Sequence, residues 1–145
     1  MTSPLRYIDW IIALAFVGVL LSMYSLLHKT GFTSGAICNL SDTFSCDIVN
    51  QGSYSEIFDI PVAGIGVAGY LFVFIAALLK RKNPADRSLS LFLLVATTGG
   101  FLFALYLTGL EAFVLFAWCI VCLTSQILIA SLAGLSFLNY RSERV

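Results

Sequence analysis

Charged side chains are scarce in this sequence: only 11% of its 145 residues are Asp, Glu, Lys or Arg. Soluble domains carry about 25% of these residues, and 59% hydrophobic residues with a mean hydropathy of +0.95 place this chain in a bilayer instead. The net charge is zero, so no basic surface predicts binding to nucleic acid. One histidine and no H-x-x-H or H-E-x-x-H pattern argue against a histidine metal site. The low content of charged residues and the lack of a basic surface or a histidine metal motif indicate a membrane protein.

Four apolar runs are long enough to cross a bilayer, whose hydrocarbon core of about 30 Å needs about 20 helical residues. We expect helices over about 10–28, 61–79, 89–107 and 112–138, with an external loop at 29–60. The first run is longer than the roughly 7–15 apolar residues of a signal peptide, so we interpret it as a retained helix. The predicted fold is an all-α integral membrane protein, a single domain over 1–145. It is a four-transmembrane-helix bundle with a cysteine-containing extracytoplasmic loop between helices one and two.

Smaller features refine this prediction. The segment 54–58 has apolar positions at helical spacing and predicts a short surface helix. Pro61 suits the first turn of the second span, and the glycines of that span favour close helix approach; they are Gly64, Gly66 and Gly69. The segment 108–111 predicts a tight turn that leaves Glu111 in solvent.

The cations indicate the orientation. If the connector at 80–87 is cytoplasmic, seven of the eight Lys and Arg residues lie inside and only Lys29 lies outside. This positive-inside bias predicts cytoplasmic termini. The same orientation places all four cysteines on the outer side, although the cysteines were not used to derive it.

The cysteines form two close pairs, Cys38 with Cys46 and Cys119 with Cys122. The second pair is a C-x-x-C set in an apolar run, and two cysteines three apart on a helix share one face, about 5–6 Å apart. That spacing permits a disulfide. The alternative is that these cysteines only pack as small hydrophobes. Zinc is the other reading of four cysteines, but the wide spacing of Cys38 and Cys46 does not fit its usual ligand pattern.

An electron acceptor for a dithiol at the edge of a bilayer must take two electrons and two protons. A quinone does this and dissolves in the same phase. Leu123 rather than His follows the C-x-x-C set, so the motif for haem attachment is missing. The sequence has no glycine fingerprint for a dinucleotide and no further cysteines for an iron–sulfur cluster.

Several motifs in order resemble the vitamin K epoxide reductase family in its single-domain bacterial form. They are Cys38…Cys46-Asp47-x-Val49, Ile60-Pro61, Gly66-x-x-x-Tyr70 and Cys119-Ile-Val-Cys122. The resemblance implies a membrane thiol–disulfide oxidoreductase of the plasma (inner) membrane that drives disulfide bond formation. Its electron acceptor would be ubiquinone or menaquinone.

The resemblance also implies roles for single residues. Cys38 would exchange with an exported thioredoxin-like oxidase on a separate chain, Cys46 would pass electrons to Cys119, and Cys122 would face the quinone. A family serine falls on Gly52 here, so the neighbouring Ser53 either takes over its hydrogen bonding as a quinone-binding residue or is an ordinary loop residue. Gln126 stands where some members place a quinone-binding Tyr, and it would bind the quinone or a neighbouring helix.

Two alternatives remain open at this stage. A sulfur relay runs in either direction, so the chain could instead carry reducing equivalents outward. The second alternative is a non-catalytic four-helix membrane protein whose disulfides are structural. Both alternatives keep the predicted fold.

Overall fold

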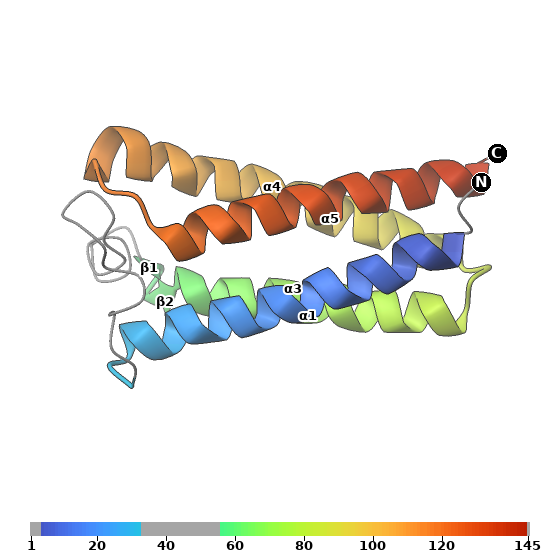
Figure 1. Ribbon diagram of the computed structural model, residues 1–145, viewed down its shortest axis with the longest axis horizontal. Coiled ribbons are helices and arrows are strands. Elements are labelled where there is room, and N and C mark those ends of the chain that lie inside the picture. The colour runs from blue at the N-terminus through green and yellow to red at the C-terminus, as the bar shows by residue number, and fades with distance from the viewer. Residues whose placement is uncertain (1–3, 33–55, 145) are drawn as a thin grey trace.

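The computed structural model describes residues 4–32 and 56–144, and helices dominate this part of the chain (Figure 1). The helices are α1 (Pro4–Lys29), α3 (Val62–Lys82), α4 (Arg87–Leu110) and α5 (Ile120–Arg144). A short π-helix, η3 (Glu111–Leu115), continues α4. Within the described residues, four helical stretches are long and apolar enough to cross a membrane. The prediction of an all-α membrane protein with four spans is therefore confirmed.

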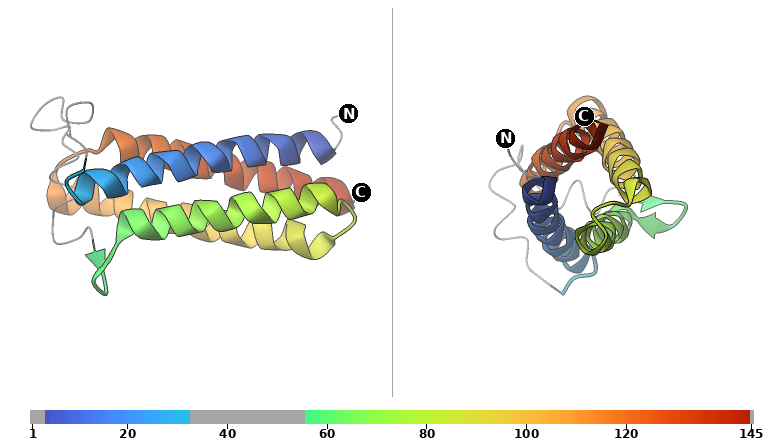
Figure 2. Two further views of the ribbon diagram at one scale, coloured as in Figure 1. Left: turned by 90° about the horizontal axis from the view of Figure 1, so that it is seen from below. Right: turned by 90° about the vertical axis from the view of Figure 1, so that its right-hand side faces the viewer.

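The four helices run side by side as a bundle, with α1 against α3 and α4 against α5 (Figures 1 and 2). The ends of α1 and α5 that lead to the two termini lie at the same end of the bundle as the α3–α4 connector. The α4–α5 connector and the β-hairpin lie at the other end. Many large apolar side chains point outward, among them Phe72, which is 63% exposed. Such an apolar exterior suits contact with lipid.

The boundary between the third and fourth helices differs from the prediction. We expected helices over 89–107 and 112–138 with a turn at 108–111, whereas α4 with η3 continues to Leu115 and α5 begins only at Ile120. Thr108 and Gly109 do not end the helix, because backbone groups in an apolar medium are best satisfied within a helix. The Thr108 hydroxyl also donates to the Ala104 carbonyl at 3.0 Å. Phe116, in the left-handed conformation with φ of 51°, ends the helix instead.

A small hairpin stands where a surface helix at 54–58 was expected. Within the described residues, β1 (Glu56–Ile57) pairs antiparallel with β2 (Ile60–Pro61), and that prediction is wrong over 56–58. Phe58 and Asp59 form the two-residue turn, and both have a positive φ, as the favoured hairpin turn requires. Lys29 at the end of α1 pairs with Glu56 at 3.1 Å, which fixes the hairpin to the bundle.

Helices α1 and α3 are in close contact at Gly18, a glycine to which the sequence analysis gave no role. A Cβ built on Gly18 would lie 2.3 Å from Cδ1 of Tyr70. Among the three glycines expected to allow close approach, only Gly66 meets a neighbour, the Ser22 hydroxyl at 3.0 Å. A Cβ built on Gly64 or Gly69 would meet none of the described residues within 4 Å, so the prediction holds for one of the three glycines.

At the end of the bundle near the termini, a polar cluster joins α3, α4 and α5. The Lys80 ammonium is buried and pairs with the Glu143 carboxylate, which also accepts from the Ser90 hydroxyl at 2.9 Å. Asn139 donates to that same hydroxyl at 3.1 Å. The ammonium also donates to the Pro84 carbonyl at 2.7 Å, so the α3–α4 connector belongs to this polar cluster.

Candidate redox site

The C-x-x-C set lies at the start of α5 rather than inside a helix. The Cys119 carbonyl accepts the first helical hydrogen bond, from Leu123 N at 2.9 Å, so Cys119 is the N-cap of α5. Its sulfur accepts from Cys122 N at 3.4 Å, in the place where a Ser or Asp side chain usually caps a helix. Both residues carry thiols, and this hydrogen bond brings the Cys119 sulfur to the backbone of Cys122. The pair therefore has the helix-start geometry typical of reactive cysteines.

Cys119 lies in the connector 116–119 between the two spans, and its side chain is fully buried. A hydrogen bond from the Cys122 side chain lowers the pKa of the Cys119 thiol below its usual value. The thiolate is the attacking form in sulfur exchange. Cys119 is therefore the sulfur of the pair that is set up to ionise first.

Glu111 is buried beside the two cysteines, and the prediction that it lies in a solvated turn is wrong. The residue is only 3% exposed, and its Oε2 accepts from Cys119 N at 3.3 Å. Its position at the start of η3 turns the carboxylate back toward the start of α5. A signal was available in the sequence, because Glu111 is the only charged residue between Arg87 and Arg141. Ionisable residues inside a membrane segment are functional candidates by default.

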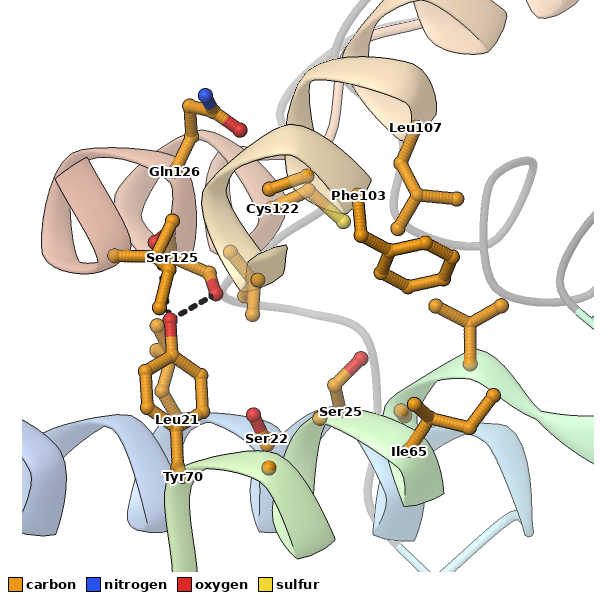
Figure 3. Close-up of a pocket in the computed structure, with 18 of the residues that line it drawn as sticks. Leu21, Ser22, Ser25, Ile65, Tyr70, Phe103, Leu107, Cys122, Ser125 and Gln126 are labelled. Carbon is orange, nitrogen blue, oxygen red and sulfur yellow. Dashed lines mark hydrogen bonds between the residues drawn. The ribbon is translucent and has the colours of Figure 1, made fainter. Parts of the chain in front are cut away.

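A cavity of about 350 Å³ opens among all four helices next to this pair (Figure 3). Its wall is mainly apolar, as binding sites for small molecules usually are. In Figure 3 the Cys122 sulfur points toward the ring of Phe103, and the Ser22 and Ser25 hydroxyls project from α1 on the opposite side. Both serines are buried, at 8% and 7% exposure. The cavity therefore combines one thiol with a few polar groups in hydrocarbon surroundings.

Tyr70 and Ser125 close one side of the cavity. The two hydroxyls are 2.8 Å apart, and the Tyr70 hydroxyl also donates to the Ser125 carbonyl at 3.1 Å. This pair links α3 to α5 one turn beyond Cys122, as Figure 3 shows. Ser125, Ser22 and Ser25 were not predicted as site residues, because small hydroxyl residues in apolar runs form no distinct pattern.

The other predicted site residues divide into two groups. Gln126 lines the cavity, as a quinone-binding residue would. It also accepts a hydrogen bond from the Thr108 hydroxyl of α4 at 3.4 Å, as a residue that binds a neighbouring helix would. In Figure 3 its amide points away from Tyr70 and Ser22. The remaining three, Cys38, Cys46 and Ser53, lie outside the described residues. Their proximity to Cys119 thus stays a prediction.

The cavity fits a quinone on two counts. Its apolar wall accommodates a hydrocarbon ring system, and the buried serine hydroxyls are donors for the oxygens of a quinone ring. The described residues hold no group of three or more His, Cys, Asp or Glu side chains that would suit a metal ion.

The fold and the site together define a multi-pass membrane protein of the thiol redox class. The chain belongs to the vitamin K epoxide reductase family, since the sequence model described as "VKOR: Vitamin K epoxide reductase family" matches residues 9–137. It is also similar to vitamin K epoxide reductase complex subunit 1 of Rattus norvegicus, with 29% identity over 150 residues, 92% of this chain and 91% of the rat protein. The family makes this protein an oxidoreductase with a membrane disulfide and quinone redox function.

Proposed function

We propose that this protein oxidises an extracytoplasmic thiol protein and reduces a bilayer quinone, and so drives disulfide bond formation. Cys38 and Cys46 exchange with the protein substrate, and electrons then pass to Cys119 and Cys122. Ubiquinone or menaquinone is the acceptor. The protein substrate is a separate thioredoxin-like oxidase, and the membrane is the plasma (inner) membrane with both termini in the cytoplasm.

The observation that carries this proposal is the Cys122 thiol in the wall of the 350 Å³ apolar cavity. Oxidation of the Cys119–Cys122 dithiol forms one S–S bond and releases two electrons and two protons. A quinone takes up both electrons and both protons to become a hydroquinone. The acceptor supplies the two-electron chemistry, while the chain supplies the sulfur pair, the apolar binding space and the hydroxyls that orient the oxygens.

The arrangement of the two ends of the bundle supports the proposed relay. The basic connector and the helix ends near the termini lie together, and α5 begins beside Cys119 at the opposite end, which also carries the hairpin at 56–61. The positive-inside rule assigns the basic end to the cytoplasm. Cys119 is then near the outer surface, where a loop thiol can reach it, and Cys122 is nearer to the lipid-soluble acceptor.

Quinone reduction by the purified protein in detergent, with dithiothreitol as the electron donor, tests this proposal. Ubiquinone and menaquinone analogues are supplied in separate assays. We expect turnover by the wild type and a loss of about 100-fold or more in Cys122→Ala, because the variant can no longer form the S–S bond. Thr124→Val is the matched control: it lies two residues along α5 and is exposed on the lipid side.

The outcomes separate the candidate functions. Turnover that is lost in Cys122→Ala and kept in Thr124→Val supports the quinone oxidoreductase. No turnover by folded wild-type protein with either quinone contradicts it and favours the outward carrier or the structural protein. Equal turnover in wild type and Cys122→Ala contradicts the role of the C-x-x-C pair.

A further inference from the structure

The proposed relay leaves one buried ionisable group of the site without a task. Glu111 is 3% exposed. No other charged residue occurs in the sequence between Arg87 and Arg141. Burying a charge in an apolar environment is costly. A buried acid in a membrane span therefore calls for a specific partner or a specific use.

The contacts of Glu111 lead to the reacting sulfurs. Its Oε2 accepts from Cys119 N at 3.3 Å, and its carboxylate interacts with the side chain of Cys122. Glu111 also lines the same cavity as Cys122. The carboxylate thus touches the backbone of one cysteine, the side chain of the other and the space in which the acceptor would bind.

The local backbone explains how these contacts arise. The π-helical turn at Glu111–Leu115 and the left-handed Phe116 bring the chain back so that α5 starts beside the end of α4. Single π-turns occur frequently at functional sites. Here the turn places an acid eight residues before Cys119 in direct contact with it.

We propose that Glu111 is the proton acceptor of the C-x-x-C pair when the dithiol is oxidised. The inference rests on the proposed quinone reductase function. The Cys122 thiol transfers its proton to the carboxylate, with no electron moved in that step. As the S–S bond forms, the electron pair passes to the quinone. Cys119, the sulfur that ionises first, has already released its proton. That proton and the proton held by Glu111 complete the hydroquinone.

A general base of this kind makes the rate depend on pH. At low pH the carboxylate is protonated and cannot accept, so the rate falls. The other ionisable groups beside the carboxylate or in the same cavity wall are the two thiols, Tyr70 of α3 and Lys29 at the end of α1. Of these, Lys29 is already paired with Glu56. The pH dependence must therefore be assigned by substitution of Glu111 itself.

Glu111→Gln is the decisive variant, because the amide oxygen can still accept from Cys119 N but the side chain can no longer take up a proton. We expect its kcat for quinone reduction to fall by about 100-fold, within the range of general-base effects. We also expect the part of the low-pH decline that Glu111 causes to disappear, which leaves only the decline caused by protonation of Cys119. Glu111→Asp keeps a carboxylate on a shorter side chain and should recover part of the rate and the low-pH decline. Asp59→Asn is the matched control: it removes a carboxylate at the same end of the bundle, in a turn that suits Asn.

The results distinguish this inference from the function on which it rests. If the wild type turns over and Glu111→Gln matches it in kcat and pH profile, the proton-acceptor role is wrong although the quinone reductase stands. No turnover by the wild type removes both. If Glu111→Gln does not fold, Glu111→Asp decides the question. If that variant turns over at the wild-type rate and shows no decline at low pH, the proposal is contradicted. A partial rate with that decline supports it.

Discussion

Gly18→Ala tests the close contact between α1 and α3 that holds the cavity wall in place. The new methyl group would lie 2.3, 2.5 and 2.7 Å from Cδ1, Cε1 and Cγ of Tyr70. Because Cγ is the root of the ring, rotating the ring about its own axis does not remove the clash. The ring must shift or the helices must separate. Either movement disturbs the hydrogen bonds between Tyr70 and Ser125.

The expected cost follows from three terms. Overpacking a close contact costs about 1–3 kcal/mol, and loss of a hydrogen bond such as that between Tyr70 and Ser125 costs about 1 kcal/mol. The better helix propensity of Ala returns about 1 kcal/mol. We therefore expect the free energy of unfolding to fall by about 2 kcal/mol, which is more than a tenfold change in the unfolding constant.

The assay is reversible unfolding of the purified protein in mixed micelles, followed by far-ultraviolet circular dichroism. Gly64→Ala is the control, because its added methyl group meets none of the described residues within 4 Å and should leave the stability unchanged or slightly higher. A second test repeats Gly18→Ala in a Tyr70→Ala background, where the cost should largely vanish because the clashing ring is gone. A stable Gly18→Ala protein, or a cost that persists without the Tyr70 ring, would refute the reasoning.

Two further predictions concern the polar cluster and the C-x-x-C pair. Lys80→Met should lower the free energy of unfolding by about 3–5 kcal/mol, because it leaves the Glu143 carboxylate without its buried cation. Lys82 is exposed, so Lys82→Met should change the free energy of unfolding by less than about 0.5 kcal/mol. Equal effects of the two substitutions would contradict this prediction. In reduced protein that lacks both loop cysteines, thiolate absorbance at 240 nm should appear below the pH of an ordinary thiol. Cys119→Ala should abolish that low-pH absorbance, and Cys122→Ala should shift it to higher pH by removing the hydrogen-bond donor; absorbance unaffected by either change would show that Cys119 is not the sulfur that ionises first.

Hydropathy was sufficient to predict the four spans, because each consists of an apolar run whose length is set by the bilayer. It was not sufficient to predict where α4 ends. The residues from Ala104 to Ile120 are apolar in nearly every position, so hydropathy is the same on both sides of the true break at Phe116. Thr108 and Gly109 gave a turn signal typical of water-soluble proteins, where backbone groups released from a helix can bond to water. In lipid that option is missing, and the helix continued.

Only some of the site residues can be recognised from the sequence. Cys119 and Cys122 are recognisable because their spacing alone permits disulfide chemistry. The hydroxyls of Ser22 and Ser125 become site residues only when α1 and α5 are placed around one cavity, which no local pattern encodes.

Moving the break from 108–111 to 116–119 changes the chemistry that the C-x-x-C pair can perform. Inside a continuous helix, the backbone N–H of Cys122 would be bonded to a carbonyl in the preceding turn, and Glu111 would lie at the bundle surface. At the start of α5 that N–H is available to the Cys119 sulfur, and the N–H of Cys119 is available to Glu111. Backbone donors at a helix start stabilise negative charge, which a thiolate requires. The π-turn and the left-handed Phe116 therefore convert an apolar sequence run into a site with an activated sulfur and a carboxylate beside it.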